Sequence, residues 1–449
     1  MTNLSDLPEQ LLSSAIAQGA EAAEVFQSGS LSRPVVFEGN RLKQVETSQS
    51  EGVALRLWKN GQPGLAVGHG PVDPAALVEK ALAISQLNAA EDPLLAKGAA
   101  AGQSSKSTGP RAFDAVGNAV AVEPLVELGR GAIARIRQQF PEVVCEAELS
   151  CDVEYTRLIN STGLDYRFED TSVSGYISAE LVEQDDFLCV GDGMLTRNQL
   201  DMDAIASNVI QRMGWAARTV PLAETNAPVP VIFTPGAAWL LWGSMRSALN
   251  GKVVKEGTSP WSQKWGAPVM SSEITLRQDP TAGPYSCPFD DEGVLTQPIL
   301  FVDQGRIKSW YCDQKTGRAK AASLPGIGTG TTGNGIRPGL GSYPTPGLIN
   351  LLVTPGDLSW EALIAQFPEA IIVDQVLGDG GDITGDMSVN LELGYRVSDG
   401  EIIGRVKDTM VTGNAYKALH ELIALGIDSE WSGSTWTPSI AVGGLSVTG

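Results

Sequence analysis

Histidine is nearly absent from this chain of 449 residues, which contains only His69 and His420. A zinc centre built on imidazole, or a hydrolase with a serine–histidine pair, therefore has few residues to draw on. The sequence also contains no GxSxG motif, and neither histidine has a serine partner in a strand-to-helix context. We expect both histidines to be structural or to lie on the surface.

Long hydrophobic runs are missing as well, and none approaches the roughly 20 residues that span a membrane. The N-terminus MTNLSDLPEQ lacks the basic-then-apolar pattern of a signal peptide. The cysteines are odd in number and include no CxxC pair, so we expect reduced and mostly buried thiols. They are Cys145, Cys151, Cys189, Cys287 and Cys312. Together these features predict a cytoplasmic protein that makes no use of a membrane.

Positive charge is in deficit, because 32 Lys and Arg face 52 Asp and Glu, which gives a formal net charge of -20. Such a chain repels a phosphate backbone instead of releasing its counterions, so direct nucleic-acid binding is not expected. The hydrophobic share of 43% and the charged share of 19% are those of an ordinary globular protein. The length suits two or three domains.

The first half of the chain alternates helical patterns with strand patterns. Amphipathic helices are predicted at 6–18, 73–89, 121–139 and 201–218. The composition of residues from about 92 to 112 indicates a flexible linker. Two meanders of antiparallel strands complete this half. The first spans 35–68, with turn signals at Glu38-Gly39-Asn40, Ser50-Glu51-Gly52 and Asn60-Gly61; the second spans 145–181 as three strands, with a turn at Asn160-Ser161-Thr162-Gly163.

Residues 234–259 contain the helix around which the second half is organised. Pro235 and Gly236 are a plausible helix start, and we expect the helix to run from 236 to 249 and to end at Gly251. Its apolar stripe predicts an amphipathic core helix. The stripe consists of Ala238, Leu241, Trp242, Met245 and Leu249.

Read with its tail Lys255-Glu256-Gly257-Thr258-Ser259, this helix resembles the TldD/PmbA family, known as metallopeptidases and as "modulator of DNA gyrase". The resemblance covers nearly the whole chain. It extends to the stretches EGNRLKQVETSQSEGVALRLW and GYRVSDGEIIGRV, and to the blocks Phe289-Asp290-Asp291-Glu292-Gly293, Thr332-Gly333-Asn334-Gly335 and Thr354-Pro355-Gly356-Asp357. It implies an α+β fold with an N-terminal domain at 1–218, made of antiparallel sheets with helices, and a β-rich C-terminal domain at 219–449 around the central helix.

The metal-bearing TldD branch carries HExxxH on this helix, with zinc-binding histidines and a glutamate base. Counting back from Gly257, those positions fall on Trp242, Gly243 and Ser247, none of which can ligate zinc or act as a base. A third ligand, a cysteine near the C-terminus, is replaced around Trp431, Ser432 and Gly433. The resemblance therefore points to the TldE/PmbA branch: a metal-free subunit, without catalytic residues of its own, of a peptidase for short or unfolded peptides. Zinc is expected only in a TldD-like partner, and a homodimer is the other possible assembly.

Three other stretches carry chemical groups. The acidic loop 378–386 has carboxylates for a hard cation but lacks EF-hand spacing, so a structural loop is the better interpretation. Asp290, Asp291 and Glu292 offer paired carboxylates, which keeps open the alternative of a self-sufficient carboxylate-dependent hydrolase that acts on another substrate. Thr332-Gly333-Asn334-Gly335 is not a phosphate loop, and its glycines suit close approach of a peptide by strand addition.

Overall fold

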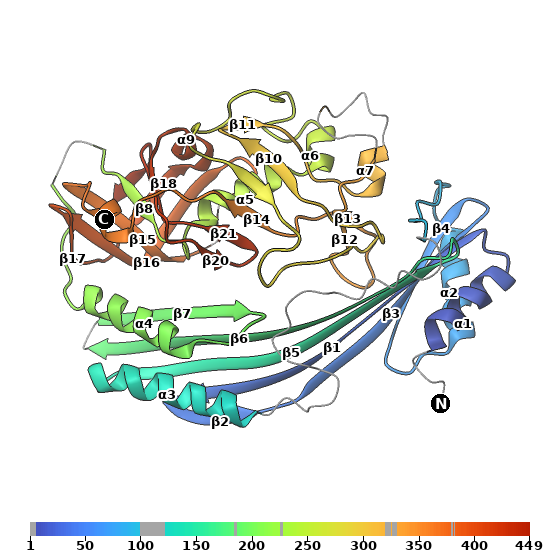
Figure 1. The fold of residues 1–449 in the computed structure, drawn as a ribbon, viewed down its shortest axis with the longest axis horizontal. Coiled ribbons are helices and arrows are strands. Elements are labelled where there is room, and N and C mark those ends of the chain that lie inside the picture. Colours follow the sequence, from blue (N-terminus) through green and yellow to red (C-terminus); the bar gives the residue numbers. More distant parts are fainter. Residues whose placement is uncertain are drawn as a thin grey trace.

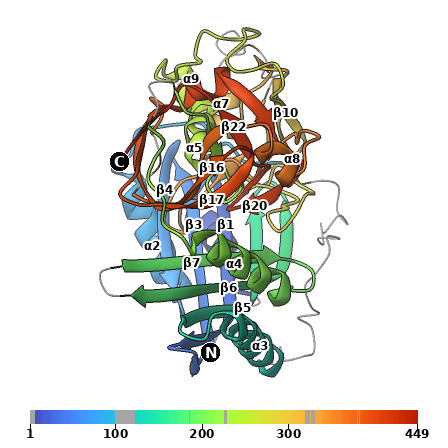
Figure 2. The same ribbon diagram turned by 90° about the vertical axis from the view of Figure 1, so that its left-hand side faces the viewer.

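The computed structural model describes residues 6–98, 122–183, 186–224, 228–318, 325, 330–378, 380 and 382–449. It has the predicted α+β fold, in which antiparallel pairing dominates the sheets. A long N-terminal sheet lies beneath a β-rich C-terminal half in Figure 1, and the view in Figure 2 shows the same stacking. None of the helices in the described ranges combines the length and apolar character needed to cross a membrane.

The N-terminal half forms one seven-stranded antiparallel sheet in the order β4-β3-β1-β5-β6-β7, with β2 paired to β1. The two predicted meanders therefore belong to a single sheet, joined where β1 pairs with β5. The strands are β1 (Ala22–Glu38), β2 (Arg41–Val45), β3 (Ser48–Lys59), β4 (Gln62–His69), β5 (Val144–Asn160), β6 (Asp165–Glu183) and β7 (Asp186–Thr196).

The predicted turns are confirmed at Asn40 and Asn60, both of which adopt positive φ angles of 69° and 53°. Two predictions were wrong. Ser50-Glu51-Gly52 lies inside β3, because β3 continues in the direction of β2 along the same edge of β1 and the chain does not reverse between Asn40 and Asn60. The range 145–181 holds two long strands instead of three, since β5 and β6 stay paired from Val144 to Ile159 without a break in register.

Helices flank this sheet where they were predicted. They are α1 (Leu7–Ala17), α2 (Pro74–Ser85), α3 (Glu123–Gln139) and α4 (Met202–Ala216). The Asp73 side chain accepts from the Ala75 N–H and caps α2, and Asp201 caps α4 through the Ala204 N–H. Figure 1 shows α1 and α2 at one end of the sheet and α3 and α4 at the other.

Successive side chains of β1 point to opposite faces of the sheet, and the two faces pack against different parts of the chain. Ala23 and Val25 share an apolar core with α1 and α2, whereas Phe26 packs with Phe289 of the C-terminal half. Glu24 also faces that half, because its carboxylate pairs with Arg337. Successive side chains of a strand point to opposite faces, so this end of the sheet is covered on both sides.

The C-terminal half contains an eight-stranded sheet and a six-stranded sheet, with a separate pair formed by β12 (Gly335–Ile336) and β13 (Thr345–Pro346). The eight-stranded sheet consists of β8 (Val231–Phe233), β15 (Glu369–Leu377), β16 (Asp386–Ser398), β17 (Glu401–Val406), β18 (Met410–Asn414), β19 (Leu422–Leu425), β22 (Ile440–Val442) and β23 (Ser446–Thr448). The six-stranded sheet consists of β9 (Leu276–Gln278), β10 (Ile299–Asp303), β11 (Arg306–Ile307), β14 (Leu351–Val353), β20 (Glu430–Ser432) and β21 (Thr435–Thr437).

The central helix is present but shorter than predicted. The chain turns through 235–238 before α5 (Trp239–Ala248) begins, and Gly251 starts the next helix, α6 (Gly251–Lys255), instead of ending α5. A β-carbon at Gly251 would collide with the Cys312 sulfur, which explains the glycine. One apolar core joins α5 to strands of both sheets, for example Phe233 and Phe301. The remaining helices are α7 (Gln314–Arg318), α8 (Trp360–Ile364) and α9 (Ala415–His420).

The domain boundary near residue 218 stays a prediction, because a single apolar core contains Ile136 and Val209 together with Ile372 and Tyr395 from across that boundary. The predicted linker at about 92–112 lies outside the described residues from 99 onward, and Leu95 in its described part is buried. All five cysteines are free, and Cys145, Cys151 and Cys312 are buried, as expected for the thiols.

Candidate functional site

Helix α5 is held against the hairpin formed by β20 and β21. The Trp242 side chain is fully buried, and its indole Nε1–H donates to Thr437 Oγ1 at 2.8 Å. Arg246 Nη1 donates to Ser434 Oγ at 2.8 Å and to Thr435 Oγ1 at 3.1 Å. The hairpin therefore contacts both the apolar side of the helix, at Trp242, and its polar side, at Arg246.

The three positions that match HExxxH differ in burial. Trp242 is buried, Gly243 is half-buried and Ser247 is exposed. Positions five apart on a regular helix lie about 140° from each other around its axis, so one side chain enters the core and the other faces solvent. An indole, a hydrogen and a hydroxyl do not have the chemistry of zinc ligands.

The hairpin does bring the third expected position close to this helix. Ser432 Oγ donates to the Gly236 carbonyl at 3.3 Å, immediately before α5. Trp431 and Gly433 flank it, and neither supplies a ligand. Within the described ranges, no three His, Cys, Asp or Glu side chains are grouped so that they could hold a metal ion. His69 and His420 are both exposed. Asp379 of the acidic loop lies outside the described residues, and Asp382 accepts from Thr384 within the loop.

The Asp290 carboxylate is buried and organises the loops around it. Its Oδ1 accepts from the backbone N–H of Glu292 at 3.0 Å and of Val294 at 2.9 Å, and its Oδ2 accepts from Gly335 N–H at 2.8 Å. Burial, opposed by these amides, raises its pKa to about 7. Since backbone N–H groups from three positions donate to its two oxygens, Asp290 connects these loops, which indicates a structural role.

Glu292 differs because its side chain lines a cavity of about 730 Å³. Its Oε2 accepts from Gln314 N–H at 2.7 Å. Burial first, and then the charge of Asp290, raises the pKa of Glu292 to about 8. Asp313 lines the same cavity. A buried carboxyl that stays protonated near neutral pH, beside a second carboxylate, is a recognised mark of a functional site.

Residues 332–335 are buried, and their polar groups bond within the chain. Asn334 Nδ2 donates to Gln278 Oε1 at 2.8 Å and to the Gly347 carbonyl at 2.9 Å. The Gly333 N–H donates to Thr331 Oγ1 at 3.0 Å. Thr332 Oγ1 accepts from Cys312 N–H at 2.7 Å. The role of Thr332, Gly333, Asn334 and Gly335 in substrate binding stays a prediction, and these contacts favour a structural role.

A buried ion cluster connects this region to the long sheet. Glu24 Oε1 accepts from Arg337 Nη2 at 2.6 Å and from Arg56 Nη2 at 3.0 Å. The Arg56 guanidinium lies 4.8 Å from the ring centroid of Trp58. All of these residues are buried. Removing Glu24 would leave two buried guanidiniums without their shared carboxylate, so this cluster helps to fix how the two halves meet.

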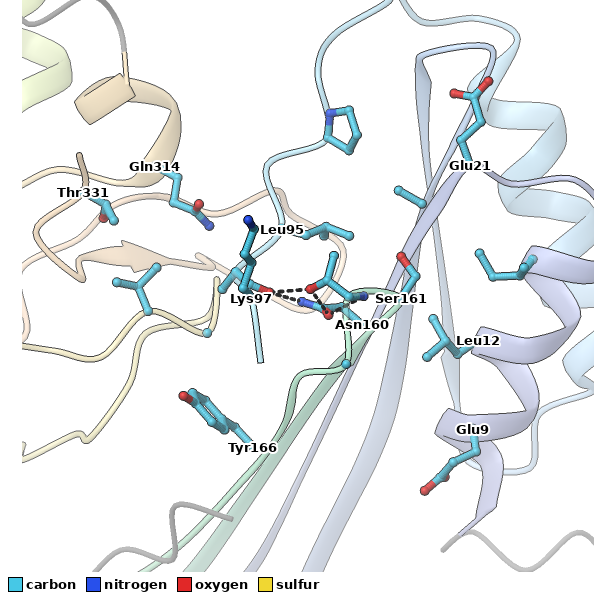
Figure 3. A pocket seen from close by; sticks show the side chains of 18 of the residues that line it. Glu9, Leu12, Glu21, Leu95, Lys97, Asn160, Ser161, Tyr166, Gln314 and Thr331 are labelled. Carbon is cyan, nitrogen blue, oxygen red and sulfur yellow. Dashed lines mark hydrogen bonds between the residues drawn. The ribbon is translucent and has the colours of Figure 1, made fainter. Parts of the chain in front are cut away.

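A cavity of about 1480 Å³ opens between α1 and the C-terminal half. Figure 3 shows Glu9 and Leu12 projecting from α1 on one side, with Gln314 and Thr331 on the other. The segment through Lys97 runs between them and is fastened by Asn160 Nδ2, which donates to the Ala96 carbonyl at 2.8 Å. The residues that line this cavity are distant in sequence, so no local motif predicted it.

Comparison with known proteins agrees with this architecture. The family model for the PmbA/TldA metallopeptidase C-terminal domain matches residues 226–449, and the model for domain 1 matches residues 23–85. A metalloprotease of Methanothermobacter thermautotrophicus is 22% identical over 92% of this chain and 89% of its own length. An uncharacterized protein of Methanocaldococcus jannaschii is 27% identical over 67% of this chain and 69% of its own.

The crystal structure of TldE from Thermococcus kodakarensis superposes with a TM-score of 0.86 at 23% identity, covering 99% of this chain and all of that one. At this identity the superposition speaks for the fold alone. The family models and the metalloprotease relatives supply the evidence for the family. On these grounds the chain belongs to the PmbA/TldD family.

Proposed function

We propose that this chain is the non-catalytic, TldE/PmbA-like subunit of a two-component metallopeptidase that processes short or unfolded peptides. The observation that carries the proposal is the state of α5: Trp242 is fully buried and bonded to Thr437 where a zinc-binding histidine would stand. In this proposal zinc and the general base come from a TldD-like partner. A homodimer is the alternative assembly, and the cytoplasm is the compartment that reduced cysteines favour.

The acidic character of the chain supports peptides over nucleic acid as its ligands. The formal net charge of -20 opposes contact with a phosphate backbone but attracts cationic segments. The cavity beside α1 offers an apolar wall and fastened backbone segments, which suit an extended chain with little sequence preference.

The test compares the chain alone with the chain after co-expression with an HExxxH-bearing homologue from the same cell. We expect copurification, zinc only when the homologue is present, and hydrolysis of unfolded peptides only by the mixture. A homologue with Gln in place of the motif Glu is the matched control and should form the complex without activity. Failure to associate, together with an inactive mixture, would refute the proposal.

A second function has one observation in its favour. Glu292, with its raised pKa, and Asp313 line one cavity, so a carboxylate-dependent hydrolase remains the competing hypothesis. It predicts that the chain alone hydrolyses a substrate, that chelators leave the rate unchanged, and that Glu292→Gln abolishes it. Activity that requires the partner and disappears with a chelator would reject this alternative.

A further inference from the structure

A cavity of about 400 Å³ lies between the end of β7, the start of α4 and the β20–β21 hairpin. Figure 1 shows the tip of β7 beneath β20, and Figure 2 shows the same hairpin above α4. The cavity is separate from α5 and from the opening beside α1. Its walls come from both halves of the chain, and no motif in the sequence marked it.

Aromatic rings form one wall of this cavity. Trp431 and Trp436 are a cross-strand pair with ring centroids 5.4 Å apart, and Tyr285 lies 5.5 Å from Trp431. Both tryptophans are only half-buried. Gly283, with a φ of +64°, lets its loop approach the Trp431 ring where a side chain would collide. Half-exposed indoles in a concavity of this size are typical of a ligand site.

Carboxylates supply the charge. Asp192 and Glu430 both line the cavity. Asp192 accepts from Asn208 Nδ2 at 2.9 Å and lies 3.8 Å from Arg212 Nη1, which compensates part of its charge, whereas Glu430 is exposed. Arg197 also contributes to the wall; it is 4% exposed, pairs with Asp170, and its Nε–H has no acceptor within the described ranges. A cation is therefore favoured near Glu430, on the side of Asp192, and an acceptor such as a peptide carbonyl is favoured beside Arg197.

The adjoining edge of β7 is partly open. β7 is the last strand of its sheet, and side chains cap its outer backbone groups at three positions. Arg405 donates to the Phe187 carbonyl, Gln375 donates to the Cys189 carbonyl, and Gln375 Oε1 accepts from Gly191 N–H. Outward groups recur every second residue, so those of Gly193 and Leu195 come next.

Gly193 and Leu195 both line the cavity, and no hydrogen bond from their outward backbone groups to another described residue is present. Gly193 is exposed and Leu195 is half-buried. An edge left unpaired at this point accepts an extended peptide as an additional strand.

We propose that this cavity binds an extended peptide segment carrying a basic side chain. The peptide backbone pairs with β7 at Gly193–Leu195. A lysine or arginine side chain lies against Trp431 and Trp436, with its charge near Asp192 and Glu430. The assignment rests on the proposed function in peptide processing and adds a preference for basic residues.

The test measures binding to the purified chain alone, by fluorescence anisotropy, of a labelled Gly/Ser peptide with one central lysine. Matched peptides carry norleucine, acetyl-lysine or glutamate at that position. We expect the lysine peptide to bind more tightly than all three, and more weakly as salt is raised. A backbone N-methyl group beside the lysine should weaken binding, because it removes a donor from the added strand.

Variants connect the preference to the cavity. Glu430→Gln should weaken binding of the lysine peptide by about 2- to 5-fold and leave the norleucine peptide unchanged, as expected for a partly exposed charge pair. Trp436→Phe keeps an aromatic ring with a weaker cation–π attraction and should narrow the difference between these two peptides. Glu127→Gln, an equivalent change at an exposed site on α3, is the control and should have no effect.

Equal affinity for the lysine and norleucine peptides, or an unchanged preference in Glu430→Gln, would overturn the assignment. The outcome is independent of the partner. A lysine preference without activity in the two-component mixture would refute the proposed function alone. Partner-dependent hydrolysis whose rate is the same with and without the lysine, and the same in Glu430→Gln, would refute this inference but not the proposed function.

Discussion

Replacing Trp242 with alanine tests what the central helix now does. The side chain is fully buried in the core that joins both C-terminal sheets, so truncation leaves a large cavity. Such a change typically costs about 3–5 kcal/mol of unfolding free energy. It also removes the hydrogen bond that the indole Nε1–H donates to Thr437 Oγ1 at 2.8 Å. We expect a marked loss of stability and no change in hydrolytic activity by the chain alone.

The size of the thermal shift depends on how much of the chain unfolds together. With an unfolding entropy of about 2.1 cal/mol/K per residue, 1 kcal/mol corresponds to about 1 °C if all 449 residues unfold as one unit. It corresponds to about 2 °C if only the C-terminal half does. Trp242→Ala should therefore lower the Tm by about 3–5 °C in the first case and by about 6–10 °C in the second.

Calorimetry and urea unfolding provide the measurements, and Trp242→Phe is the matched control. Phenylalanine retains most of the ring but loses the N–H, so it should cost about 1–2 kcal/mol, clearly less than alanine. A thermally neutral Trp242→Ala would refute the reasoning. Loss of a hydrolytic activity that the unmodified chain shows by itself would do the same, because it would place Trp242 in a working cleft.

Three further predictions follow from the same site. Purified chain should contain no stoichiometric zinc and should lose no stability with a chelator; elemental analysis showing near one zinc per chain would contradict this. The combined variant Trp242→His, Gly243→Glu, Ser247→His should show no peptidase activity in a peptide-hydrolysis assay, because the third ligand expected near Ser432 is still absent; peptide hydrolysis by this variant alone would contradict this. Glu292→Gln should remove part of the pH dependence of stability, since burial and the charge of Asp290 raise the pKa of Glu292 to about 8, while Asp290 with its own raised pKa remains. The wild-type chain should lose stability as the pH rises from about 4.5, the pKa of the unfolded carboxyl, to about 8, because the unfolded state releases its proton first. Across that range the unfolding free energy of the variant should rise by at least about 1 kcal/mol relative to that of the wild-type chain. Parallel curves of Tm against pH would contradict this prediction.

The sequence determined the local elements of this protein. Capping by Asp73 and Asp201, the turns at Asn40 and Asn60, and the apolar stripe around Trp242 were all legible, because each depends on neighbours within a few residues. The chemistry missing at positions 242, 243 and 247 was legible for the same reason. A tryptophan, a glycine and a serine cannot ligate zinc in any fold.

Tertiary structure decided how those elements combine. The Ser50-Glu51-Gly52 signal failed because β3 pairs with β1 on one side and β4 on the other, and ladder hydrogen bonds outweigh a local turn preference. Gly251 appeared to end a helix, but it is required by the nearby Cys312 sulfur.

The cavities could not be predicted from the sequence for a similar reason. Asp192, Trp431 and Trp436 line one pocket although they lie in distant strands, and only the pairing of strands and the packing of the two halves places them together. The raised pKa of Glu292 likewise arises from burial by segments far along the chain. Local propensity acts over a few residues, whereas burial and proximity are properties of the whole fold.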